Sequence, residues 1–152
     1  NENLFKNADL NSDGVWETTI YGGAEGDSKI ENGTAIFHLT KLGTDDWAPQ
    51  FKQVDLQIEQ GCTYRLSMNV NSTIARDIIF KVQQNGEPYT TYLQETKALS
   101  VGDNNINIEF TMKSASDARA LFCAAMGAQK ISDEHTLTFS NMSLVKIAEA
   151  IN

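Results

Sequence analysis

The sequence is poor in several residue types that mark well-known protein classes. It has two cysteines, two prolines and two histidines in 152 residues, so it carries neither a disulfide framework nor metal-protease histidine spacing. Basic residues are also scarce, because twelve lysines and arginines face twenty acidic residues. The net charge of −8 argues against nucleic acid as a partner. No apolar run approaches the roughly 18 residues of a membrane span, so we expect a soluble domain outside the membrane.

Recognisable catalytic motifs are absent as well. Neither a Gly-x-Ser-x-Gly elbow nor a phosphate-binding Walker loop occurs. Glycosidases use two carboxylates that folding brings together, so the acidic residues of this sequence do not exclude a small glycosidase. The acidic pairs Asp45-Asp46 and Glu25/Asp27 lie in loop-like sequence, however, where solvated charge is the default. We therefore expect a protein that binds rather than catalyses.

What the sequence does contain is ordinary for one globular domain. Apolar residues make up 41% and charged residues 21% of the chain, and its length suffices for one full core. We assign residues 1–147 to that domain and residues 148–152 to a tail or the start of a linker. No signal peptide is visible, so we expect a segment excised from a longer protein. For Cys62 and Cys123 we favour buried free thiols over a disulfide.

Hydrophobic residues recur at every second position through most of the chain. In residues 62–71 every even position is apolar and every odd one polar, and residues 104–113 repeat the pattern. Shorter versions cover residues 54–58 and 137–139. Such alternation predicts strands with one buried and one solvent-exposed face. A shift of the apolar phase near Asn141 predicts a β-bulge there.

Turn sequences separate these strands at short intervals. Asn32-Gly33, Asn85-Gly86 and Gly102-Asp103 are examples, because asparagine and glycine tolerate the positive φ of tight turns. Many short strands divided by such turns predict an all-β fold, an antiparallel β-sandwich of the jelly-roll type.

One segment, residues 116–130, carries two conflicting signals. Its alanine-rich interior and the glycine near its end are typical of a helix, but its apolar residues also alternate like those of a strand. We favour the strand, because a lone helix fits poorly among strands and tertiary context often overrides propensity. The inward residues are then Phe122, Ala124 and Met126, and the outward ones Leu121, Cys123 and Ala125.

Aromatic and amide side chains gather on one side of the predicted sandwich. Strand parity places Gln53 and Gln83 on the solvent-exposed face. Trp47 precedes one of these strands, and Tyr89 follows the other in a turn stiffened by Pro88. Aromatic faces stack on the C–H faces of sugar rings, and amides bond hydroxyls without adding charge. The set suits a neutral polysaccharide; the alternative is that both rings merely cover the ends of the sandwich.

The segment Asp9–Gly14 matches the opening D-x-N-x-D-G of an EF-hand calcium loop. Ile20 holds the position of the closing glutamate, and no flanking helices are evident, so we reject a full EF-hand. Two readings of Asp9, Asn11 and Asp13 stay open on equal terms. They form either a polar Asp-Gly turn or part of a structural ion site.

The order of several motifs resembles the family 4 carbohydrate-binding modules, jelly-roll modules attached to cellulases, laminarinases and xylanases. The resemblance covers nearly the whole chain and is strongest around residues 84–89. The matching segments are Asn3–Asp9, Trp16, Tyr21, Trp47-x-x-Gln50, Gly61–Ser67, Gln84–Tyr89, Leu93 and Ala98-Leu99.

The resemblance implies a noncatalytic module that holds one glycan chain across a concave sheet face. Trp47 and Tyr89 would stack on sugars, Tyr21 would form a further edge of the cleft, and amides would bond hydroxyls. The amides implied by the motif are Gln50 and Asn85; parity and proximity add Gln53, Gln83 and Gln94. Family members often hold a structural calcium away from the groove, which here implies Asp9, Asn11, Asp13 and Asn141 as ligands.

Two departures from the family pattern stand out. Residues 121–125 are apolar where some members carry glutamines, and Ser140-Asn141 replaces the usual Asp-Asp pair. We expect binding of single chains of soluble or amorphous β-glucan, either β-1,4 or mixed-linkage. The module would target a covalently linked glycoside hydrolase to plant polysaccharide, secreted or at the cell surface in a bacterial-type extracellular setting. The alternatives are a xylan-binding module of a xylanase and, behind it, a small glycosidase.

Overall fold

A computed structural model describes residues 2–151 of the chain. Asn1 and Asn152, the outer ends of the predicted domain and tail, lie outside the described residues. The described residues form ten strands and no helix, so none of them makes a helix able to cross a membrane. The strands are β1 (Glu17–Thr19), β2 (Glu25–Glu31), β3 (Thr34–Lys41), β4 (Gln50–Ile58), β5 (Thr63–Ser72), β6 (Arg76–Gln83), β7 (Thr91–Leu99), β8 (Gly102–Thr111), β9 (Asp117–Ala125) and β10 (His135–Ala148).

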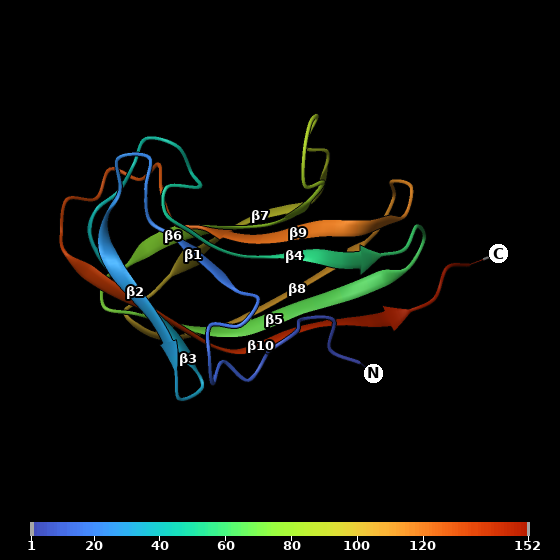
Figure 1. Cartoon of the computed structure of the whole chain (residues 1–152), viewed down its shortest axis with the longest axis horizontal. Coiled ribbons are helices and arrows are strands. Elements are labelled where there is room, and N and C mark those ends of the chain that lie inside the picture. The colour runs from blue at the N-terminus through green and yellow to red at the C-terminus, as the bar shows by residue number, and fades with distance from the viewer. Residues whose placement is uncertain (1, 152) are drawn as a thin grey trace.

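The strands form two five-stranded sheets packed face to face (Figure 1). The front sheet has the order β1-β4-β9-β6-β7 and the back sheet the order β2-β3-β10-β5-β8. Every strand pair within them is antiparallel. The predicted antiparallel jelly-roll sandwich is therefore confirmed.

The core lies between the sheets and follows the predicted alternation. In β5 every second residue is buried, and in β6 the inward side chains of Ile78, Phe80 and Val82 are fully buried. Phe51 of the front sheet contacts Phe139 of the back sheet, with ring centroids 5.1 Å apart. Burying each such side chain contributes about 1.5–3 kcal/mol, which outweighs the local preferences of single residues.

Strand β9 resolves the ambiguous segment in favour of a strand. It occupies the centre of the front sheet, between β4 and β6, where both neighbours satisfy its backbone hydrogen bonds. Its inward side chains belong to the main core, as predicted. Its outward side chains form a separate apolar cluster on the outer face of the front sheet, which consists of Leu121, Cys123 and Ala125 with Val54 and Ile79 packed against them.

Two β-bulges change the direction in which side chains point. The predicted bulge in β10 is confirmed, because its pairing with β5 shifts between Ser140 and Ser143 and Asn141 has a φ of 56°. A second bulge, which the sequence did not reveal, lies in β4 between Gln53 and Leu56, where Asp55 has a φ of 61°. An extra residue in a strand reverses the faces of all residues beyond it.

Both cysteines are buried and unpaired, which confirms the prediction of free thiols. A buried arginine is the other unusual core group. Arg76 donates from Nη2 to the carbonyl of Met126 at 2.5 Å, and its Nη1 lies 2.9 Å from His135 Nε2. His135 Nδ1 lies 2.9 Å from the Asp133 carbonyl, so the neutral ring with its proton on Nδ1 satisfies both contacts. Burial lowers the pKa of Arg76 to about 10.

Candidate functional site

A groove with a volume of about 470 Å³ lies on the outer face of the front sheet. Its floor comes from β4, β9 and β6, and its ends come from the loops that precede β2 and β4 and follow β6 (Figure 1). Eight residues line it: Tyr21, Trp47, Gln50, Lys52, Gln83, Asn85, Tyr89 and Leu121. Residues more than 60 positions apart in the sequence thus meet at one surface.

Two aromatic rings form one end of the groove. The rings of Tyr21 and Trp47 lie 5.2 Å apart between centroids and are tilted by 46°. Gly22 passes beneath Trp47 so closely that a Cβ on Gly22 would lie 2.9 Å from the indole ring. Gly43 N donates to the Ala48 carbonyl at 2.8 Å, which closes the loop that carries Trp47. The indole is therefore held in place by its neighbours.

Tyr89 forms the opposite end, in the loop of residues 84–90 that projects from the sheet between β6 and β7 (Figure 1). Its N–H donates to the Gly86 carbonyl at 2.6 Å, and Gln84 N donates to the Thr90 carbonyl at 2.8 Å. Tyr89 has a φ of 57°, a conformation that non-glycine residues rarely adopt, and its side chain is 52% exposed. An exposed aromatic ring held by a strained backbone is typical of a binding surface.

The floor between these ends combines amide, ammonium and apolar side chains, and Gln50 within it is bonded to a buried thiol. Cys123 Sγ donates to Gln50 Oε1 at 3.0 Å, which leaves the Gln50 amide N–H groups as its remaining donors. Desolvation raises the pKa of the Cys123 thiol to about 12, so the sulfur stays protonated. The Leu121 side chain, which lies two residues before Cys123 on β9, completes the floor beside Gln83 of β6.

The charged groups beside the floor are paired. Lys52 and Lys81 flank Cys123 in the register of the sheet. Lys81 Nζ lies 2.6 Å from Asp46 Oδ2, and Lys52 Nζ lies 3.8 Å from Glu17 Oε1. Because each lysine faces a carboxylate, the groove presents little net charge to a ligand.

The model of a family described as a carbohydrate-binding domain, CBM_4_9, matches residues 2–130. The chain belongs to this family of carbohydrate-binding domains. The resemblance seen in the motifs is thereby confirmed. Membership indicates a domain that binds carbohydrate.

Solved structures share the fold of this CBM_4_9 domain. A CBM4 structure superposes with a TM-score of 0.76 at 23% identity, covering 96% of this chain and 98% of that one. The N-terminal cellulose-binding domain of Cellulomonas fimi β-1,4-glucanase C gives 0.70 at 22% identity, covering 92% and 94%. The second N-terminal cellulose-binding domain of the same glucanase gives 0.74 at 19% identity, covering 97% and 95%.

A curated relative is the cellulose 1,4-β-cellobiosidase of Acetivibrio thermocellus. It is 31% identical over 84 residues, which cover 51% of this chain and 9% of the cellobiosidase. The CBM_4_9 domain therefore spans a small part of the length of that relative.

Most of the predicted binding residues line the groove of the CBM_4_9 domain together. These are Tyr21, Trp47, Gln50, Gln83, Asn85 and Tyr89. Their contact with a glycan stays a prediction. Gln94 faces the same side of the front sheet, in register with Lys81, but it lies on the edge strand β7 beyond the groove lining.

The placement of Gln53 on the solvent-exposed face is wrong. Gln53 is fully buried, accepts a hydrogen bond from Lys6 N at 2.8 Å and donates one to the Lys6 carbonyl at 3.0 Å. The alternation through Leu56 and Ile58 predicts an outward Gln53, but the bulge at Asp55 reverses the two faces before that residue. Gln53 therefore anchors the N-terminal segment and does not reach the groove.

The same bulge explains the groove residue Lys52, which the sequence reasoning missed. Lys52 shares the face of Gln50, two positions before it, and this spacing was the available signal. Leu121 was placed on the outer face correctly but was not assigned to the site. Apolar side chains on an outer face give no sign from the sequence that they form a groove floor.

The residues predicted to bind calcium form local turns in this structure. Asp9 accepts hydrogen bonds from Asn11 at both carboxylate oxygens, at 3.5 Å from N and 3.1 Å from Nδ2. Asp13 Oδ1 accepts from Gly14 N at 2.9 Å. Asn141 sits in the bulge of β10. These carboxylates are occupied by donors and do not form a ready oxygen cage, so calcium here stays a prediction.

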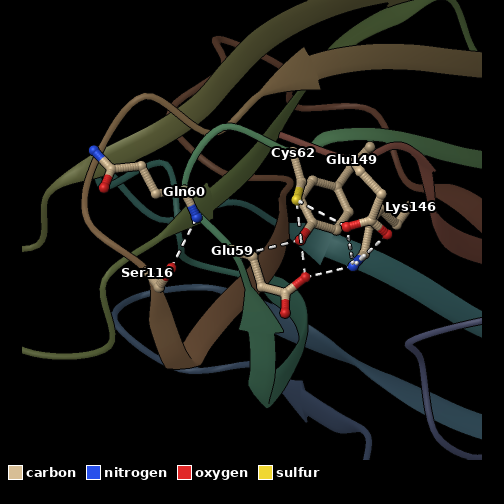
Figure 2. A network of polar contacts seen from close by, with 7 residues as sticks. Glu59, Gln60, Cys62, Ser116, Lys146 and Glu149 are labelled. Carbon is tan, nitrogen blue, oxygen red and sulfur yellow. Dashed lines mark hydrogen bonds and ion pairs between the residues drawn. The ribbon is translucent and has the colours of Figure 1, made fainter. Parts of the chain in front are cut away.

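A cluster of a different kind lies where the turn between β4 and β5 meets the end of β10 (Figure 2). Ligand atoms of Glu59, Cys62 and Glu149 lie within 4.8 Å of one another, as they would around a metal ion. Lys146 Nζ, however, lies 2.5 Å from Glu59 Oε2 and 3.1 Å from Glu149 Oε2. Its hydrogen bonds to these carboxylates raise the pKa of Lys146, so an ammonium ion already holds the cationic position.

Proposed function

We propose that the groove binds a single chain of soluble or amorphous β-glucan, with β-1,4 or mixed linkages. The observation that carries this is the placement of aromatic rings at both ends of one open groove, with amides and the apolar side chain of Leu121 between them. Sugar rings present C–H faces that stack on aromatic rings and hydroxyls around their rims that hydrogen-bond amides. The paired charges of Lys52 and Lys81 favour a ligand without charge.

The wider role rests on the family and on similar domains. CBM_4_9 membership supports polysaccharide as the partner, and the similar structures include cellulose-binding domains of a β-1,4-glucanase. We propose that the domain is tethered to a glycoside hydrolase that it targets to plant polysaccharide. The setting would then be secreted or cell-surface, of the bacterial extracellular type. A structural calcium at Asp9, Asn11, Asp13 and Asn141 belongs to the same proposal and awaits its own test.

Affinity electrophoresis tests the ligand class. Native gels containing soluble β-1,4-glucan, mixed-linkage glucan, xylan or mannan should retard the wild-type domain most in the two glucan gels. Trp47→Ala and Tyr89→Ala should each weaken binding about ten-fold, the loss of roughly 1.4 kcal/mol of stacking. Tyr89→Phe is the matched control, since it keeps the ring and should keep the retardation. Weak affinity overall is expected, because sugar hydroxyls exchange water for protein at little net gain.

Several outcomes contradict the proposal. Stronger retardation in xylan than in glucan would assign the groove to xylan. Normal binding by both alanine variants would remove the groove from the site. Release of reducing sugar from these polymers by the purified domain would show a glycosidase instead.

A further inference from the structure

A second hollow lies on the other side of the 84–90 loop. Its volume is about 460 Å³, close to that of the groove, and Asn85 lines both. The loop projects from the front sheet (Figure 1), and its residues line both hollows. Arg119 lines the second hollow and lies two residues before Leu121 on β9, so the two side chains share one face of the strand. The two hollows are therefore neighbours on a single surface.

The walls of the second hollow are held by hydrogen bonds. On one side, the segment after β8 is tied to the turn before β5, because Gln60 N donates to Ser116 Oγ at 2.8 Å (Figure 2). On the other side, Thr90 N donates to the Gln84 side-chain oxygen at 3.2 Å, next to the backbone bond between the same residues. A hollow with fixed walls loses little entropy when it binds a ligand.

A fixed carboxylate lies within the hollow. Asp117 accepts from the Tyr92 hydroxyl at 2.8 Å and from Arg119 N at 2.8 Å. Desolvation, reinforced by the bond to Asp117, raises the pKa of Tyr92 to about 12, so this phenol remains a donor at any ordinary pH. Both contacts fix the rotamer of Asp117 and leave its remaining lone pairs free to accept from a ligand.

Donors stand close to this acceptor. Arg119 Nε lies 3.2 Å from Asp55 Oδ1, and its side chain is 81% exposed, so its terminal amino groups are open to a ligand. The amide of Asn85 and the hydroxyl of Ser114 also line the hollow. Neighbouring hydroxyls on a sugar ring both donate and accept, which an aspartate and an arginine side by side can satisfy together. Arg119 offsets only one of the two carboxylates Asp55 and Asp117, so the hollow disfavours an acidic sugar.

We propose that the second hollow binds a neutral sugar branch of the polysaccharide whose main chain lies in the groove. This inference rests on the proposed function. A straight chain on the groove floor meets the 84–90 loop as a wall, so the second hollow does not simply continue the groove. Asn85 lines both hollows, so a branch that passes from one to the other runs along Asn85. The hollow is within the roughly 300–1,000 Å³ of small-ligand sites.

Calorimetry with two oligosaccharides tests this. One is linear cellohexaose and the other a xyloglucan oligosaccharide, a β-1,4-glucan with single-sugar branches. Arg119→Ala should weaken binding of the branched ligand about five-fold, as for the loss of one hydrogen bond, and leave cellohexaose unaffected. Arg65→Ala is the matched control, because Arg65 forms a similar pair with Glu109 at 2.9 Å on the back sheet. It should change neither affinity.

The variants separate failure of this inference from failure of the proposed function. If Arg119→Ala and Ser114→Ala bind the branched ligand as the wild type does, the second hollow takes no branch, whatever the groove does. If Arg119→Ala weakens both ligands equally, the residue belongs to the main-chain site and the inference is wrong. If Trp47→Ala leaves binding of cellohexaose intact, or if the wild type does not bind it, the proposed groove itself fails.

Discussion

Gly127→Ala should disable the groove although Gly127 does not line it. A Cβ at this position would overlap the carbonyl oxygens of Asp45 and Ala48, on either side of Trp47. The same segment holds the Trp47 loop through its backbone, since Gly127 N donates to the Asp46 carbonyl at 2.8 Å and Ala128 N to the Gly43 carbonyl at 3.0 Å. The added methyl can be accommodated only if the two segments move apart.

The size of the effect follows from these contacts. Overpacking of a buried site costs about 1–3 kcal/mol, and about 2 kcal/mol lowers the Tm of a domain this size by roughly 4–8 °C. Displacing the indole removes its stacking on the ligand, so we expect at least a ten-fold loss of β-glucan affinity. Thermal unfolding and calorimetry on the same sample measure both quantities.

Gly102→Ala is the matched control for this prediction. Gly102 has a φ of 99°, and no atom lies within 4 Å of its added Cβ. The substitution should therefore cost stability through backbone strain alone and leave glucan binding unchanged. If Gly127→Ala lowers the Tm but binds glucan like the wild type, the backbone of residues 126–128 does not position Trp47 and the reasoning is refuted.

Two further predictions concern pH and calcium. Burial, with a smaller contribution from Arg76, holds the pKa of His135 below its ordinary 6.5, so the unfolded chain takes up this proton at a higher pH than the folded one. The contribution of neutral His135 to the free energy of unfolding should thus be present in full above pH 6.5 and decrease as the pH falls from there through the folded-state pKa. Chemical denaturation should show a smaller decrease in the free energy of unfolding for His135→Gln. An equal decrease in both proteins would contradict this role. A calcium site at Asp9 and Asp13 should raise the Tm in calcium relative to EDTA. At a calcium concentration of 100 times the dissociation constant, the free energy of unfolding should increase by about 2.7 kcal/mol, and Asp9→Asn should abolish this increase. An identical Tm in both buffers would reject the site.

The fold was predictable because alternation of apolar residues is repeated in strand after strand. In β5 and β6 a single period of two gives the buried face without error, since neither strand is interrupted there. β9 shows how far such a signal reaches. Its alanines favour a helix locally, but its central place between β4 and β6 gives its backbone two hydrogen-bonding partners. Its inward side chains pack in the main core, and its outward ones pack against Val54 and Ile79.

The site was predictable in its rings and less so in its floor. Trp47 and Tyr89 lie in loops at the ends of strands, where parity errors do not accumulate. Gln53 lies within a strand, and a single left-handed residue, Asp55, was enough to reverse its face. The residue type of Asp55 is at most a weak marker of a bulge. Aspartate is depleted in strands and tolerates positive φ through its short polar side chain, but neither property locates a bulge.

The second hollow could not be seen from the sequence at all. Its residues come from the 84–90 loop, from β7, from the segment that joins β8 to β9 and from the start of β9. Their nearness depends on the order of strands in the front sheet, which alternation alone does not specify. Pairings such as Tyr92 with Asp117 are contacts of the folded chain, 25 residues apart, and leave no local pattern.

The buried thiol that bonds Gln50 has a consequence for the chemical reactivity of the protein. Oxidants and alkylating agents react with thiolates, and Cys123 is almost wholly protonated and 3% exposed. The sulfur can react only when the strands around it separate. The surface beside this cysteine therefore tolerates an oxidising medium for as long as the sheet stays closed, and the rate at which an alkylating agent labels Cys123 would report how often the sheet opens.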